Sequence, residues 1–352
     1  MAPARSDDDD LRRDTLVDAK KTQLGVGKTK TKRSEAERAK DLALVGTMVG
    51  PYLVGAELGG GAMGVVYRAT NIDTNRVVAL KVMRPQLLEE TTTVARFRRE
   101  ARIASRLGHP HVGGVVELVE SEGRYAMALD FVDGEPLSAI MTMPVAPERV
   151  AMIIGQLLRG LEHAHAMGLV HRDLKPDNVL VEWRNSRDHA RIIDFGIAIA
   201  KFGSDDSIER ITEAGLVVGT PMYMAPEQAR GEQVDHRADL YSLGMIMFEM
   251  LSGVAAYEGK ALDVLTAKLK RDVPAIKDRV PALIVDPLLE RFCRKLVTRD
   301  REQRFSSARH ALIVLEMIAN DRAAAGVALG IMDVEKALAV VSLPSPAPLR
   351  RP

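Results

Sequence analysis

The chain changes its hydrophobic period along its length, and this change limits the folds that it can adopt. Five short runs with the alternation of β-strands occupy the first part, at 52–58, 64–69, 77–83, 115–120 and 125–129. One segment of helical period, 92–107, interrupts them. Later segments are mostly helical in period, at 148–167, 238–251, 262–270, 287–296 and 306–320. The sequence therefore predicts an α+β fold in which a small antiparallel β-rich part with one helix precedes a larger α-helical part.

The ends of the chain differ from its middle in composition. Residues 1–48 mix acidic and basic runs with few large apolar side chains, which predicts a flexible charged tail. We expect one domain at 49–319, with the β-rich part at about 49–132 and the helical part at about 133–319. A C-terminal extension, 320–352, ends in a segment with four prolines that we expect to be unstructured.

Charge and cysteine content exclude several classes of protein. Lys and Arg number 49 against 48 for Asp and Glu, so the net charge of +1 gives no field that would attract nucleic acid. Cys293 is the single cysteine and cannot form an internal disulfide. The longest uncharged stretch, 42–56, contains glycines and a proline and is shorter than the roughly 18 apolar residues of a spanning helix. Since no signal peptide precedes it, we expect a cytoplasmic protein without a membrane span.

A glycine-rich turn separates the first two predicted strands. It reads Leu58-Gly59-Gly60-Gly61-Ala62-Met63-Gly64-Val65-Val66. Glycines without β-carbons let a backbone approach a polyphosphate and offer N–H groups to it. A dinucleotide fold would require a helix after this turn, whereas here a strand follows. The turn therefore predicts a flap over phosphates, with a flexible hairpin as the alternative.

Two buried charges in the β-rich part need partners. Lys81 lies inside the predicted strand 77–83, on the same face as Ala79. Glu100 lies on the apolar side of the predicted helix 92–107, where an unpaired carboxylate is costly. Each can satisfy the other. Beside a glycine flap, the pair is better explained as holding a phosphate than as a structural ion pair.

The stretch from His171 to Asn178, His-Arg-Asp-Leu-Lys-Pro-Asp-Asn, is followed by Asp194-Phe-Gly. Asp173 can orient a hydroxyl group and accept its proton. Asn178 and Asp194 supply the oxygen ligands that Mg²⁺ prefers. Lys175 adds a cation for the charge on a transferred phosphoryl group.

Together these motifs resemble those of the eukaryotic-type serine/threonine protein kinases, over residues 50–318. Val78-Ala-Leu-Lys81 and Ala225-Pro-Glu227 match two further signatures of that family, in the expected order. The resemblance implies that Asp239 braces the catalytic loop and that Arg304 pairs with Glu227. Lys175 and the Gly219-Thr-Pro221 sequence resemble serine/threonine rather than tyrosine kinases, and the surrounding sequence is similar to bacterial members.

The resemblance implies a two-lobed protein kinase fold that transfers the γ-phosphoryl group of ATP, with Mg²⁺ or Mn²⁺, to Ser and Thr of protein substrates. It implies catalytic roles for Asp173, Lys175, Lys81 and Glu100, with Asn178 and Asp194 as metal ligands. The expected ATP-binding residues are Leu58, Gly59, Gly60, Gly61, Ala62, Met63, Gly64, Val65, Val66, Ala79, Lys81, Asp130, Val132 and Leu180. We further expect self-association for autophosphorylation, with Thr212 as the switch and Arg172 as the partner of its phosphate.

Two other classes of function are compatible with such a fold. One is a pseudokinase, a nucleotide-binding scaffold that usually has lost the lysine, the catalytic aspartate or the metal-binding aspartate; none is lost here. The other is a small-molecule phosphotransferase, which the Ala225-Pro-Glu227 sequence disfavours. One departure from the family is the pair Gly113-Gly114 after His109-Pro-His111, which we expect to loosen the link to the next strand.

Overall fold

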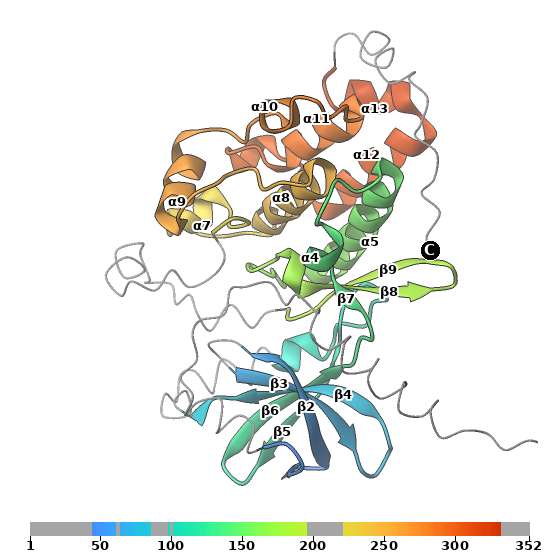
Figure 1. Ribbon diagram of the computed structural model, residues 1–352, viewed down its shortest axis with the longest axis vertical. Coiled ribbons are helices and arrows are strands. Elements are labelled where there is room, and N and C mark those ends of the chain that lie inside the picture. Colours follow the sequence, from blue (N-terminus) through green and yellow to red (C-terminus); the bar gives the residue numbers. More distant parts are fainter. Residues whose placement is uncertain (1–43, 61–63, 86–97, 99–100, 196–220, 332–352) are drawn as a thin grey trace, which may run out of the picture. The chain divides into compact units, whose positions relative to one another are not determined.

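The computed structural model describes residues 44–60, 64–85, 98, 101–195 and 221–331, all within one unit of the chain. Figure 1 shows a β-sheet built from the first of these residues and a set of helices built from the last. The α+β class is therefore confirmed. The predicted Lys81–Glu100 pair, the Thr212 switch and the glycine-turn residues 61–63 include positions outside the described residues.

Six antiparallel strands form the first sheet, in the order β1-β2-β3-β4-β6-β5. Their bounds are β1 Met48–Val49, β2 Tyr52–Gly60, β3 Gly64–Asn71, β4 Val77–Met83, β5 Val115–Ser121 and β6 Arg124–Asp130. In β4, Val78, Leu80 and Val82 are buried in the sheet core, as the alternation predicts. The predicted antiparallel sheet is thus confirmed, with strand ends that differ by one or two residues from those expected.

The predicted helix 92–107 falls mostly outside the described residues. Its described part is helical at residues 101–104, where Ala101 and Ala104 are 2% and 3% exposed. Ala101 packs with Met83 and Met127 of the sheet. Ala101 therefore packs against β4, the strand that carries Lys81, and its neighbour β6, whereas Ala104 belongs to the core of the helical part.

A second, three-stranded sheet, which the sequence analysis did not anticipate, has the order β7-β8-β9. Its strands are β7 Glu135–Pro136, β8 Val179–Arg184 and β9 Arg187–Ile192. A hydrogen bond from the Gly113 N–H to the Ile192 carbonyl, 2.7 Å long, joins β9 to the chain that enters β5. This hairpin lies between the His171–Asn178 stretch and Asp194, so it fixes where both of them stand.

The helices are α4 Leu137–Ile140, α5 Pro147–Ala166, α7 Pro226–Ala229, α8 Arg237–Ser252, α9 Ala261–Lys270, α10 Ile276–Arg279, α11 Pro287–Leu296, α12 Ala308–Asn320 and α13 Arg322–Ala328. Short 3₁₀ turns occur at Pro176–Asn178 and Arg301–Gln303. The five longer helices, α5, α8, α9, α11 and α12, match the five predicted ones, whereas the four short ones were not expected.

Helix α8 is the centre of the helical part. Burial extends to 14 of its 16 residues, and α5 and α11 pack against it (Figure 1). A helix apolar on all sides is stable only inside a core. The buried carboxylate of Asp239 must therefore have hydrogen-bond donors, and residues His171 and Arg172 supply them.

The predicted domain boundary at 319 falls just before helix α13. Ala325 and Leu329, 0% and 2% exposed, are buried with the helical core, and the Asp321 side chain caps α13 by accepting from the Ala324 N–H. The first residues of the expected extension thus pack with the helices.

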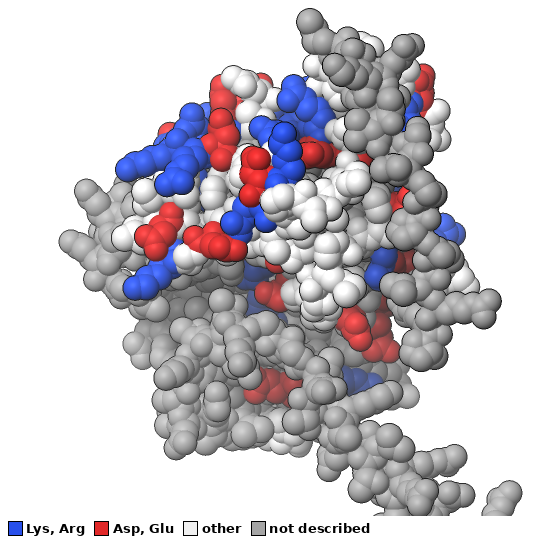
Figure 2. Space-filling model, turned by 45° about the horizontal axis from the view of Figure 1, so that its top comes forward, with Lys and Arg blue, Asp and Glu red and all other residues white. Residues whose placement is uncertain are grey.

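None of the described helices is both long enough and apolar enough to cross a membrane. On the face drawn in Figure 2, acidic and basic side chains of the described part are interspersed.

Candidate active site

The predicted catalytic loop, His171–Asn178, brings its charged side chains together at the start of the β8–β9 hairpin. Lys175 Nζ lies 3.0 Å from Asp173 Oδ2, and the two side chains are 22% and 29% exposed. Asn178 donates from Nδ2 to the Asp173 carbonyl, at 2.8 Å, which orients the amide and leaves Oδ1 as its ligand atom. The loop therefore presents an accessible carboxylate, a cation beside it and an amide oxygen.

Asp239 of α8 binds the backbone of this loop. Its side chain is fully buried and accepts hydrogen bonds of 2.8 Å from the backbone N–H groups of His171 and Arg172. Arg172 has a φ of 65°, a left-handed conformation that is costly outside glycine. The two hydrogen bonds to a charged acceptor stabilise this conformation, so Asp239 is where the resemblance implies a brace.

His165 of α5 is a third partner of Asp239. Its Nε2 lies 2.8 Å from Asp239 Oδ2. Burial raises the pKa of Asp239, but the interactions with His165 and with His171, including the His171 backbone N–H, together outweigh burial and bring this pKa below its ordinary value. The carboxylate is therefore ionised. The two residues are 74 positions apart in the sequence, so no local pattern predicts this contact.

Lys81 of β4 and Asp194, just after β9, form an ion pair of 3.1 Å. Their side chains are 12% and 29% exposed. Burial raises the pKa of Asp194, yet the Lys81 ammonium outweighs burial, so the pKa lies below 3.8. Asp194 also has a φ of 64°. The structure thus joins the predicted phosphate-binding lysine to the predicted metal ligand, a pairing that was not predicted. The expected partner of Lys81, Glu100, lies outside the described residues.

The residues around Asp194 are tied to the catalytic loop. His171 Nε2 lies 3.1 Å from the Ile193 carbonyl oxygen, and the Phe195 ring meets the His171 ring edge-on at 4.8 Å between centroids. Phe195 is 4% exposed. The Asp173 N–H donates to His171 Nδ1 at 3.3 Å, so His171 links the residues that flank Asp194 to the backbone of Asp173.

The described part of the glycine turn agrees with a flap between strands. Gly59 and Gly60 pair with Val66 and Val65, so a strand and not a helix follows the turn. A β-carbon on Gly64 would clash with the Val82 carbonyl oxygen, which is why glycine stands there. Residues 61–63 lie outside the described residues.

The predicted ATP-binding side chains divide between the two faces of the sheet. Val66 lies opposite Lys81 in the β3–β4 register, so these two share the face that carries Ala79. Val65 instead is 3% exposed and belongs to the sheet core on the other face. Its side chain therefore cannot contact a ligand beside Lys81, so only its backbone remains available. Leu58 is 46% exposed at the end of β2.

The other predicted adenine contacts follow β6. The Asp130 carboxylate holds the segment that leads into β5, because it accepts from the Gly114 N–H at 3.0 Å. The same carboxylate pairs with Arg76 at 2.8 Å. The Asp130 N–H donates to the Gly114 carbonyl. These bonds hold the link at Gly114, where a β-carbon would approach Asp130 Oδ2 to 2.9 Å. That the glycine pair loosens the link stays a prediction. Val132 is 6% exposed, and Leu180 of β8 is half-buried.

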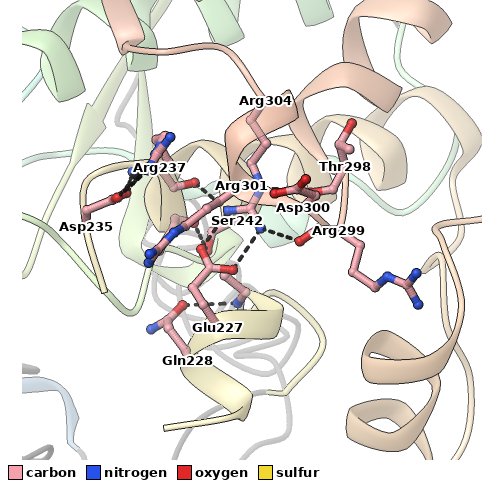
Figure 3. Close-up of polar contacts among 12 residues, drawn as sticks. Glu227, Gln228, Asp235, Arg237, Ser242, Thr298, Arg299, Asp300, Arg301 and Arg304 are labelled. Atoms are coloured by element: carbon pink, nitrogen blue, oxygen red, sulfur yellow. Dashed lines mark hydrogen bonds and ion pairs between the residues drawn. The ribbon is translucent and has the colours of Figure 1, made fainter. Parts of the chain in front are cut away.

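Glu227 and Arg304 form a buried ion pair, drawn in Figure 3, with exposures of 2% and 0%. Two hydrogen bonds of 2.6 and 2.8 Å join the guanidinium to the carboxylate. Three further bonds run from Arg304 to the carbonyl oxygens of Thr298, Arg237 and Arg299. All five N–H donors of the guanidinium are therefore used.

Arg172 is the expected partner of a phosphorylated Thr212. Its backbone carbonyl accepts from Gln228 Nε2 at 2.8 Å, but its buried Nε has no partner among the described residues. A buried guanidinium nitrogen without an acceptor is costly. Thr212 itself lies outside the described residues, so the switch stays a prediction.

Comparisons with known proteins agree with this geometry. Residues 52–314 match the family described as "Protein kinase domain". The chain is 39% identical over 281 residues to serine/threonine-protein kinase pkn3 of Myxococcus xanthus, covering 78% of this chain and 51% of that protein. It is 36% identical over 266 residues to serine/threonine-protein kinase PknD of Mycobacterium tuberculosis, covering 75% and 39%.

A solved structure is also similar. The PknI kinase domain of Mycobacterium tuberculosis has a TM-score of 0.58 at 28% identity, over 77% of this chain and 97% of that one. The chain thus spans about half of pkn3 and 39% of PknD.

Proposed function

The chain belongs to the protein kinase domain family, and on that premise we propose that it transfers the γ-phosphoryl group of ATP to serine and threonine hydroxyls of proteins, its own activation segment included. The catalytic unit that we propose is the predicted domain, 49–319, together with α13. Proteins would be its partners, and a second copy of the chain would be one of them.

The 3.1 Å contact between Lys81 and Asp194 carries this proposal. Lys81 lies in β4 of the first sheet, and Asp194 follows β9 of the second sheet. Their opposite charges meet beside the predicted catalytic loop. A phosphate group needs the cation and a metal ion needs the carboxylate. Two groups with these complementary tasks at one point support binding of a nucleotide with its metal.

The chain's own residues would perform the transfer as follows. Asp173 orients the substrate hydroxyl and accepts its proton as the oxygen attacks phosphorus. Lys175, 3.0 Å from Asp173, offers positive charge to the oxygens of the transferred group. Lys81 holds the phosphates of the nucleotide. Positioning and charge stabilisation supply most of the catalysis in phosphoryl transfer. These residues provide both types of group that the reaction requires.

The donor set fits a hard divalent cation. The Asn178 amide is oriented with its oxygen available, and the Asp194 carboxylate is kept ionised by its environment. Oxygen donors of this kind suit Mg²⁺, and Mn²⁺ accepts the same ligands. A bound Mg²⁺ supplies neutralisation of the phosphate charge. Asp194 and Asn178 would hold it, and Lys81 would then be released from Asp194 toward the phosphates.

Phosphate transfer by the purified chain tests this function. We expect labelled ATP with Mg²⁺ to phosphorylate Ser and Thr of the chain and of protein substrates. Asp173→Asn should lower the rate by at least about a hundredfold, the low end for a general base. Asp73→Asn, a change in an exposed turn, is the matched control and should retain the wild-type rate.

Other outcomes would point elsewhere. Binding of ATP without transfer in the wild type would favour the scaffold alternative. Transfer to small molecules and not to proteins would favour the other phosphotransferase class. A folded Asp173→Asn variant with the wild-type rate would refute the assigned chemistry.

A further inference from the structure

Lys268, on helix α9, is a buried cation in the helical part. It is 1% exposed. Its Nζ donates to the Met222 carbonyl at 2.6 Å and to the Met224 carbonyl at 2.8 Å. Both acceptors belong to the Pro221–Ala225 segment, which precedes α7. A side chain from one helix thus binds two carbonyl groups of an irregular segment that lies 44 and 46 residues earlier.

The surroundings of Lys268 compensate its charge only in part. No carboxylate of the described residues lies within ion-pair distance of Nζ; the rings of Tyr241 and Tyr257 are 4.9 and 5.8 Å away. Burial lowers the pKa of Lys268 well below 10.5. Removing an amine from water is costly, and an apolar side chain would fill the same space without that cost. The benefit of lysine here must therefore lie in its N–H donors.

The acceptors of these donors form a continuous stretch. The carbonyl of Tyr223, between the two methionines, accepts from Ser242 Oγ at 2.8 Å. Three successive carbonyls are thus bound by side chains, two of them by Lys268. The phenol of Tyr223 also donates to Glu249 at 2.6 Å. Among the described residues, the backbone at 222–224 is held by these side chains and not by hydrogen bonds to a helix or strand.

This fixed stretch borders the catalytic loop. Gln228 Nε2 donates to the Arg172 carbonyl at 2.8 Å, which ties the start of α7 to the residue before Asp173. The charge of Asp177 raises the pKa of Glu249, although burial is the larger cause. Asp177 also acts on Tyr223 in the same way. Tyr223 and Glu249 thus lie near Asp177 of the predicted catalytic loop, so a polypeptide that delivers a hydroxyl to Asp173 would approach residues 222–224.

We propose that Lys268 is a positioning residue for the protein substrate: by holding the Met222 and Met224 carbonyls, it fixes the backbone along which a substrate polypeptide lies. The proposal rests on the proposed function. It places the role of Lys268 in binding the polypeptide and not in binding ATP, since Lys268 contacts neither Lys81 nor the catalytic loop.

Kinetics with separate substrates test this role. Lys268→Met removes the donors at similar size, Lys268→Arg keeps them, and Lys270→Met changes an exposed lysine of the same helix as a control. With a Ser/Thr peptide that the wild type phosphorylates, Lys268→Met should raise the peptide KM about tenfold, as for one to two lost hydrogen bonds. The KM for ATP and the slow hydrolysis of ATP without peptide should stay within about twofold. Lys268→Arg should recover most of the peptide affinity.

Amide hydrogen exchange gives a second readout that needs no activity. The amides of residues 222–225 should exchange faster in Lys268→Met than in Lys270→Met, while those of α8 should not change. An unchanged peptide KM in active Lys268→Met, or unchanged exchange at 222–225, overturns the proposal. Equal losses for ATP and peptide also overturn it, because they indicate a general structural defect. If the wild type phosphorylates no peptide, the proposed function fails, and exchange alone then decides whether Lys268 holds this backbone.

Discussion

Replacement of Arg304 should lower the free energy of unfolding far more than replacement of a surface arginine. Arg304→Met leaves the Glu227 carboxylate, 2% exposed, without its cation and leaves three carbonyls without their donor. Breaking a buried pair in this way typically costs about 3–5 kcal/mol. Since all five donors of Arg304 are in use, we expect about 4 kcal/mol here.

A second variant separates charge from shape. Arg304→Lys keeps the charge but has three donors for the same acceptors, so we expect a loss of about 2 kcal/mol. Glu227→Gln with Arg304→Met leaves no buried charge and should lose less than Arg304→Met alone. The coupling energy from the full mutant cycle should then be at least about 2 kcal/mol.

Urea unfolding followed by the helical circular dichroism signal measures these losses. Fluorescence is a poorer probe, because the single tryptophan, Trp183, is 69% exposed in the folded protein. The control is Arg159→Met, which breaks an ion pair with Glu316 whose side chains are 45% and 49% exposed. Such exposed pairs are worth about 0–1 kcal/mol. A loss for Arg304→Met as small as that of the control, or a coupling energy near zero, would refute the reasoning.

Three further outcomes are expected. After complete dephosphorylation, incubation with ATP should activate the wild type, and Thr212→Ala and Arg172→Ala should gain much less; equal gain by Thr212→Ala would exclude Thr212 as the switch. Burial lowers the pKa of His111 from 6.5 to about 4, so the unfolded chain binds more protons between these values and stability should fall as the pH drops through this range. His111→Asn should lose less stability there in thermal unfolding, and a loss equal to that of the wild type would contradict this account. Cys293 is fully buried, and burial raises the pKa of its thiol, so thiol reagents should label it only in denaturant; rapid labelling of the native protein would count against the packing described.

The sequence predicted the positions of strands and helices wherever the hydrophobic period matches the pattern of buried residues. The strands of the first sheet and the long helices have clean alternation or a clean apolar stripe, and their positions were predicted within about two residues. The β8–β9 hairpin was missed because it buries charge: Glu182 and Asp188 are each 6% exposed. Arg149 of α5 pairs with Asp188 at 2.7 Å, a partner that no local pattern reveals. Helices of four residues, such as α4, are too short to have a period.

For the candidate site, the sequence predicted residue types better than pairings. The motifs name Lys81, Asp173 and Asp194, but the sequence predicted Glu100 as the partner of Lys81 and Asp194 only as a metal ligand. The structure describes the pair with Asp194. His165 and Lys268 were missed for a related reason, since each acquires its role only from a backbone or side chain many residues away.

The dependence of the catalytic loop on Asp239 has a consequence for synthesis of the protein. The acceptor that holds the His171 and Arg172 N–H groups is added to the chain 66 residues after Asp173 (239 − 173). At about 5–20 residues per second, this takes roughly 3–13 s. During that interval the growing chain contains the whole loop sequence but not the residue that imposes its left-handed turn. A chain whose translation pauses between the two positions would carry every chemical group of the loop and still be unable to arrange them.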